Sequence, residues 1–165
     1  MKRHIFLTGL RGVGKSTVLT KVLGKFQGKI GGFQTIWREN SLYLMDFGEK
    51  NVTADRLVAG RSDLVRWRDS QKFDHIAPQL LTESDVIVMD ELGFFEGNSP
   101  RFQQWVFQCL DGETPVIGVI KPQHTDFLDK IRNHPQVEVI WVTETNRRGL
   151  GEEQIWAKCI NGTQK

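Results

Sequence analysis

The fold of this chain is decided by the stretch Gly9-Leu10-Arg11-Gly12-Val13-Gly14-Lys15-Ser16. The stretch fits the pattern G-x-x-x-x-G-K-[S/T], in which glycines let successive backbone N–H groups turn inward toward phosphate oxygens. An apolar run at 5–8 comes before it, and apolar residues at helical spacing follow over 16–26. A strand, a glycine-rich turn and a helix N-terminus together predict a phosphate-binding loop.

The loop assigns a role to each polar residue that follows its last glycine. Lys15 is expected to reach the β- and γ-phosphates of a nucleotide, and the Ser16 hydroxyl to ligate Mg²⁺. Thr17 is expected to face the α-phosphate. The predicted nucleotide-binding residues of this segment are Gly9, Leu10, Arg11, Gly12, Val13, Gly14, Lys15, Ser16 and Thr17.

Further strands and helices alternate along the rest of the chain. Apolar runs predict buried strands at 86–89 and 116–120, and a further strand is predicted at 137–142. Helical spacing predicts helices at 73–81, 99–110, 125–133 and 152–160, with Ser99 as the N-cap of the second of these.

Two other segments complete the expected fold. The segments 33–38 and 42–47 flank a polar turn and predict an antiparallel hairpin, whereas 48–68 is expected to be loop with some helix. The sequence therefore predicts a single domain over 1–165 with an α/β fold, a three-layer α/β/α sandwich. Its sheet would be mostly parallel, with an antiparallel hairpin addition.

Composition narrows the classes of partner. Lys and Arg number 22 and Asp and Glu number 20, so the net charge of +2 argues against nucleic-acid binding by bulk charge. The longest apolar runs are far shorter than the roughly 20 residues of a membrane span. Cys109 and Cys159 lie far apart without metal-ligand spacing. We expect a cytoplasmic protein without a membrane partner, and the sequence indicates no particular protein partner.

A second motif follows the apolar run at 86–89, where Asp90 and Glu91 stand side by side. A strand that ends in an acid delivers a carboxylate to the carboxyl edge of the sheet, where α/β folds bind ligands. Asp90 is expected to hold Mg²⁺, and Glu91 to act as general base toward water. Helix capping or loop solvation would explain an isolated pair of this kind equally well.

A third motif directly follows the predicted strand at 137–142. Asn146 and Arg147 lie in this polar segment and are candidates for contact with base, ribose or phosphates. A solvated turn is the alternative. We therefore predict three catalytic residues, Lys15, Glu91 and Arg147, and two metal-binding residues, Ser16 and Asp90.

Four segments in order resemble the small P-loop nucleoside-triphosphatase family that includes the cancer-related NTPase. They are 2–17, the segment 31–38 with Gly31-Gly32-Phe33-Gln34-Thr35 and Arg38, Asp90-Glu91-Leu92-Gly93-Phe94-Phe95-Glu96, and Val142-Thr143-Glu144-Thr145-Asn146-Arg147. The resemblance implies slow, Mg²⁺-dependent hydrolysis of several nucleoside triphosphates, such as ATP or GTP, on a P-loop NTPase fold. Arg11 stands where the family usually has proline, and Phe94 where it has lysine.

Two other functions are compatible with the same motifs. A kinase of a nucleotide or other small molecule would share the phosphate loop, and arginines of the segment 48–68 could cover a second phosphate-bearing substrate. A nucleotide-binding switch without significant turnover is the third reading.

Overall fold

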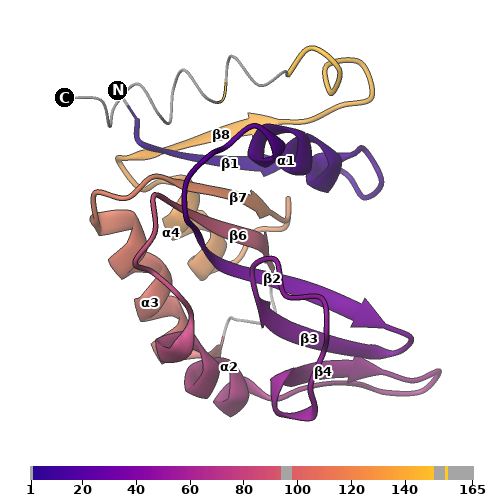
Figure 1. The fold of residues 1–165 in the computed structure, drawn as a ribbon. Coiled ribbons are helices and arrows are strands. Elements are labelled where there is room, and N and C mark those ends of the chain that lie inside the picture. The colour runs from indigo at the N-terminus through magenta and orange to yellow at the C-terminus, as the bar shows by residue number, and fades with distance from the viewer. Residues whose placement is uncertain (1, 94–97, 151–154, 156–165) are drawn as a thin grey trace.

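A computed structural model of the protein describes residues 2–93, 98–150 and 155. Within these residues, eight strands form one sheet in the order β5-β4-β3-β2-β6-β7-β1-β8 (Figure 1). Strands β2, β6, β7, β1 and β8 run parallel to their neighbours in this series, and β3, β4 and β5 extend the sheet antiparallel. The strands are β1 His4–Thr8, β2 Ile30–Arg38, β3 Ser41–Asp46, β4 Leu57–Arg61, β5 Arg66–Arg68, β6 Val86–Leu92, β7 Val116–Ile120 and β8 Val137–Trp141.

Helices cover both faces of this sheet, which confirms the predicted three layers. Helix α1, Lys15–Gly24, packs on one face with Ile5 and Leu7, while Phe6 points into the core on the other face. This alternation follows from the two-residue period of a strand. The second face carries α2 Ser70–Ile76, α3 Pro100–Asp111 and α4 Asp126–Arg132. None of the helices in the described part of the chain is long and apolar enough to cross a membrane.

The predicted hairpin is confirmed, but the sheet continues beyond it. Strands β2 and β3 pair from Phe33 with Asp46 to Arg38 with Ser41. The expectation of loop with some helix over 48–68 missed two strands, because this segment holds β4 and β5 beside its loops and one short 3₁₀ turn, Ala54–Arg56. Val58 and Ala59 are fully buried against the core, and pairing with β3 decides their conformation.

The start of α3 also differs from its prediction. Ser99 occupies the N-cap position, yet its hydroxyl makes no capping bond and donates to the Ser70 carbonyl over 3.0 Å. The carboxylate of Asp74 in α2 accepts the hydrogen bond from the Phe102 N–H over 2.9 Å. A neighbouring helix thus supplies the cap. The predicted helix at 152–160 lies outside the described residues except for Ile155, which is buried beside α1.

Candidate functional site

The carboxyl ends of four neighbouring parallel strands, β6, β7, β1 and β8, meet at one edge of the sheet. The phosphate loop follows β1, Asp90 and Glu91 lie near the end of β6, and Lys121 comes directly after β7. The turn with Arg147 follows β8. Parallel α/β sheets bind ligands at this edge, so the topology brings the predicted motifs together.

Backbone geometry explains the glycines of the phosphate loop. Gly9 has a φ of 148°, and a Cβ atom there would lie 2.5 Å from the carbonyl oxygen of Val142. Gly14 has a φ of 99° and forms the N-cap of α1, and Gly12 has a φ of 81°. The chain can therefore turn sharply beside β8 and present the N-terminus of α1 to solvent, where anions are stabilised.

Lys15 lies across its own loop. Its ammonium donates hydrogen bonds to the carbonyl oxygens of Gly9 and Leu10, each over 2.8 Å. Burial lowers the pKa of Lys15, and Lys121 lowers it further, while Glu91 and Asp90 act in the opposite direction. The Lys15 ammonium is therefore held against its own loop, close to the charged groups of Glu91, Asp90 and Lys121.

Ser16 and Asp90, the two predicted metal ligands, are neighbours. The Ser16 hydroxyl lies close enough to the Asp90 carboxylate to favour its charged form. Burial, with the neighbouring charge of Glu91, raises the pKa of Asp90 to about 6 despite the Ser16 hydroxyl and the charge of Lys15. A partly buried carboxylate beside a hydroxyl offers the hard oxygen donors that Mg²⁺ prefers. The residues present therefore fit the predicted ion, whose remaining ligands would be phosphate oxygens and water.

Glu91 has a cationic neighbour that the sequence prediction missed. The Lys121 Nζ lies 3.7 Å from Glu91 Oε1, and both side chains are about one-third exposed, at 30% and 34%. Lys121 follows β7, so strand pairing brings it to the end of β6, where its N–H donates to the Leu92 carbonyl over 2.9 Å. The sequence held one indication of this neighbour, because Lys121 directly follows the predicted buried strand at 116–120.

The turn after β8 places Arg147 against the phosphate loop. The Arg147 guanidinium makes a long hydrogen bond of 3.5 Å to the Val13 carbonyl, and its Cδ would lie 3.4 Å from a Cβ at position 14. Asn146 stabilises this turn, accepting from the Thr143 N–H over 2.7 Å and donating to the Trp141 carbonyl over 2.8 Å. Its described contacts are local, so contact of Asn146 with nucleotide stays a prediction.

The remaining loop residues are open to solvent. Leu10 is 65% exposed, and Arg11 and Thr17 are exposed as well, whereas Val13 is half-buried and packs beside α1. Arg38, which lies in one of the four segments that resemble the family, is exposed and donates a long hydrogen bond of 3.4 Å to the Trp37 carbonyl. Arg147, which lies outside the loop in sequence, therefore places its guanidinium against the loop backbone, whereas the side chains of Arg11 and Arg38 are exposed.

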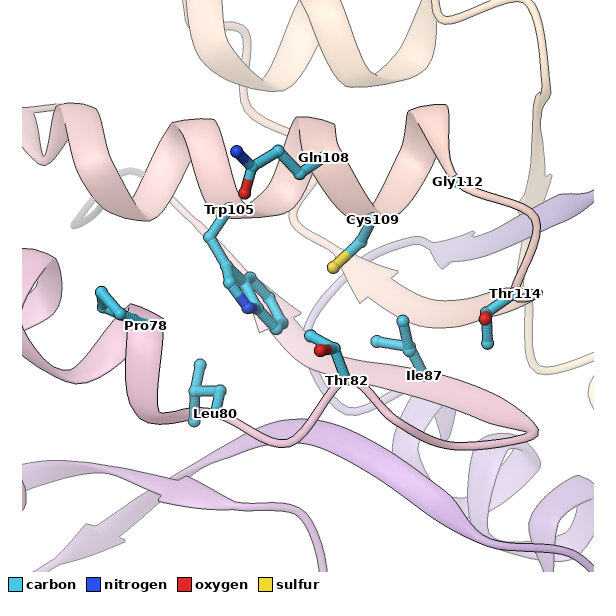
Figure 2. A pocket seen from close by; sticks show the side chains of 9 residues that line it. All are labelled: Pro78, Leu80, Thr82, Ile87, Trp105, Gln108, Cys109, Gly112 and Thr114. Carbon is cyan, nitrogen blue, oxygen red and sulfur yellow. The ribbon is translucent and has the colours of Figure 1, made fainter.

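A separate cavity of about 450 Å³ lies away from these residues (Figure 2). The side chains of Trp105 and Cys109 reach into it from α3, opposite Leu80 and Ile87. It contains none of the residues predicted to bind nucleotide or metal. The candidate site is therefore the open edge around the phosphate loop and not this cavity.

Comparison with known proteins identifies the family of the chain. The profile of a family described as NTPase matches residues 4–155. The nucleoside-triphosphatase THEP1 of Thermotoga maritima is 29% identical over 172 residues, which cover 98% of each chain. The human cancer-related nucleoside-triphosphatase is 29% identical over 192 residues and 100% of each chain.

A solved structure resembles the fold described above. The crystal structure of THEP1 from Aquifex aeolicus superposes with a TM-score of 0.75 at 23% identity, covering 95% of this chain and 99% of that one. At this identity the likeness concerns the fold, and it agrees with the predicted α/β architecture. The family match over most of the chain, together with the phosphate loop, Asp90 and Glu91 at one edge, shows that the chain belongs to this NTPase family.

Proposed function

We propose that the protein is a nucleoside-triphosphatase that hydrolyses ATP or GTP to diphosphate and phosphate with Mg²⁺. One observation carries this proposal, the meeting of Lys15, Asp90 and Glu91 at the carboxyl edge of the sheet, close enough that both carboxylates act on the ammonium. A phosphate cradle, a metal-binding carboxylate and a general base are the parts that triphosphate hydrolysis requires.

The phosphate loop and Lys15 would bind the triphosphate. The N–H groups at the start of α1 bind phosphate oxygens, and the Lys15 ammonium exchanges its bonds to Gly9 and Leu10 for oxygens of the β- and γ-phosphates. Phosphate oxygens would thus replace two carbonyl oxygens as the acceptors of the same ammonium. Arg147 lies on the same loop and adds positive charge near the phosphates.

Glu91 would act on the attacking water. A carboxylate near the γ-phosphate accepts a hydrogen bond from water, orients it in line with the bond that breaks, and takes up its proton. Glu91 is about one-third exposed and so can be reached by water. Ser16 and Asp90 would hold the Mg²⁺ ion, which supplies positive charge to the phosphate oxygens.

The names of the relatives agree with hydrolysis as the reaction. The Thermotoga maritima and human proteins are both named nucleoside-triphosphatases, and each aligns with nearly the whole chain. Two of the four arginines in the segment 48–68 contact neighbouring side chains, whereas Arg66 and Arg68 on β5 are exposed. Arg56 pairs with Asp46 over 3.0 Å, and Arg61 lies over the ring of Trp37. No observation therefore favours a kinase, and a cytoplasmic location stays a prediction.

Phosphate release from ATP, GTP, CTP and UTP tests the proposal. The wild-type protein should release phosphate from at least one of them with Mg²⁺ and without any acceptor. Glu91→Gln should bind nucleotide normally and lose about 10²–10⁴-fold in kcat, the usual effect of removing a positioned base. Glu83→Gln, at an exposed glutamate outside the site, is the matched control and should keep the full rate.

Three results would count against the proposal. Turnover that requires an added hydroxyl or phosphate acceptor would identify a kinase. Tight binding without phosphate release would identify a nucleotide-binding switch. A full hydrolysis rate in Glu91→Gln would remove the assigned base.

A further inference from the structure

We propose that Lys121 is a positioning residue for Glu91, which it holds on the β7 side of the phosphate loop in the orientation needed to direct water. This inference rests on the proposed function, because it concerns the base of that reaction. Its basis is the ion pair between the ends of β6 and β7, where Lys121 Nζ lies 3.7 Å from Glu91 Oε1.

The energetics of this pair favour orientation over stability. Both side chains are about one-third exposed, at 30% and 34%, so water screens their attraction. Ion pairs of this kind contribute little to the free energy of unfolding. They can still restrict a carboxylate to one region of space, which is the property that a general base needs.

The backbone at Lys121 is fixed from two sides. Its N–H donates to the Leu92 carbonyl over 2.9 Å, and its carbonyl accepts from the guanidinium of Arg132 in α4. Arg132 also donates to the Gln123 carbonyl over 2.7 Å and pairs with Asp129 over 2.7 Å. The segment that carries Lys121 is therefore tied both to β6 and to a helix of the second face.

The aliphatic part of Lys121 passes close to Gly93. A Cβ atom at position 93 would lie 3.2 Å from the Lys121 Cδ and 3.4 Å from its Cε. The side chain thus runs over the glycine that follows β6 and returns toward Glu91. Because Gly93 has no side chain, the Lys121 side chain can pass over it, and its ammonium reaches Glu91.

The pairing of Glu91 with Lys121 also concerns Lys15, the predicted phosphate-binding cation. Glu91 and Lys121 both act electrostatically on the Lys15 ammonium, with opposite signs, so the three charges are neighbours. Without Lys121, the carboxylate of Glu91 would be drawn to Lys15, the cation that must bind phosphate. Lys121 follows β7, the strand between β6 and β1, and so supplies a second cation with which Glu91 pairs in place of Lys15.

A double-mutant cycle tests the proposal by steady-state kinetics with Mg²⁺ and ATP or GTP. Lys121→Met keeps the length of the side chain and removes its charge, and it should lower kcat about tenfold while KM stays within about twofold. Lys121→Arg should restore most of the rate. In a Glu91→Gln background, Lys121→Met should cause no further loss. Lys130→Met, at an exposed lysine of α4, is the control and should behave as wild type.

The outcomes separate this inference from the proposed function. A wild-type protein that hydrolyses no nucleoside triphosphate overturns the function itself. If the wild type is active and Glu91→Gln is slow, a normal kcat in Lys121→Met overturns the role of Lys121. Equal losses in the two backgrounds, or no rescue by arginine, also overturn it. Thermal melting checks the fold of each variant, and Lys121→Gln replaces Lys121→Met if the latter melts early.

Discussion

The Lys15 ammonium is hydrogen-bonded to the Gly9 carbonyl oxygen over 2.8 Å, so the phosphate loop is closed on its own lysine. A second bond of 2.8 Å, to Leu10, completes this arrangement. Both acceptors belong to the loop and neither to the core, so the lysine contributes mainly to the ligand-binding geometry. A triphosphate must therefore compete with two carbonyl oxygens for the same cation.

Lys15→Ala should remove turnover while the protein stays folded. The β- and γ-phosphates lose the cation that the loop holds nearest to them, and loss of one such group typically costs about 10²–10³-fold in rate. The measurements are kcat, nucleotide affinity and the melting temperature. Near-normal hydrolysis in this variant would contradict the active-site assignment, whereas an unchanged melting temperature with little activity would support it.

Ser16→Ala should raise the Mg²⁺ concentration needed for half-maximal activity, because one oxygen donor beside Asp90 is lost. Asp90→Asn should weaken both metal dependence and nucleotide binding, since it removes the negative charge as well. Activity is titrated with Mg²⁺ at saturating nucleotide. Thr20→Ala is a suitable control, because that exposed hydroxyl donates within α1 to the Ser16 carbonyl. An unchanged Mg²⁺ titration in Ser16→Ala would exclude its hydroxyl as a ligand.

Arg147→Ala should impair turnover or nucleotide affinity more than Arg11→Ala. The Arg147 guanidinium reaches the loop carbonyl of Val13, whereas Arg11 is exposed. An arginine that meets the charge of the transferred phosphoryl group contributes about 10³–10⁵ in rate, so an effect near this size would identify that role. Both variants and Arg38→Ala are compared by kcat and KM at saturating Mg²⁺. A silent Arg147→Ala beside an inactive Arg11→Ala would reverse the ranking.

His4 should make the stability of the protein depend on pH. The buried ring accepts a hydrogen bond from the Val116 N–H over 3.1 Å, and its other nitrogen lies 2.9 Å from the Leu110 carbonyl, an arrangement of the neutral form. Burial lowers the pKa of His4 from 6.5 to about 4. Below pH 6.5, His4 binds a proton in the unfolded chain, whereas in the folded chain it stays neutral down to about pH 4. The free energy of unfolding therefore falls as the pH is lowered from 6.5 to about 4.

Urea unfolding at several pH values between 7.5 and 4 measures this loss. A shift of this size corresponds to about 3 kcal/mol at the acid end of the window. His4→Gln should be less stable at pH 7.5 and should lose less on acidification than wild type. His75→Gln, at an exposed histidine of α2, should keep the wild-type dependence. Identical losses in wild type and His4→Gln would show that other groups cause the effect.

The parallel strands and the phosphate loop could be predicted because their signals are local in the sequence. The clearest of these strands, β6 and β7, contain apolar runs, and Asp90 and Glu91 directly follow the run at 86–89. Strands β4 and β5 were missed because their exposed arginines conceal a pattern that only pairing with β3 reveals. Lys121 was missed for a related reason, since it meets Glu91 through strand pairing across about thirty residues of sequence.

The charged edge of the sheet at β5 has a consequence for self-association. An edge strand exposes unpaired backbone groups that can add a strand from another chain, and short length and charge oppose this. Strand β5 has three residues, all exposed, and two of them are arginines, Arg66 and Arg68. Two copies that approached edge to edge would bring these cations against one another. The antiparallel extension thus ends the sheet in a short, positively charged edge strand, which opposes edge-to-edge aggregation.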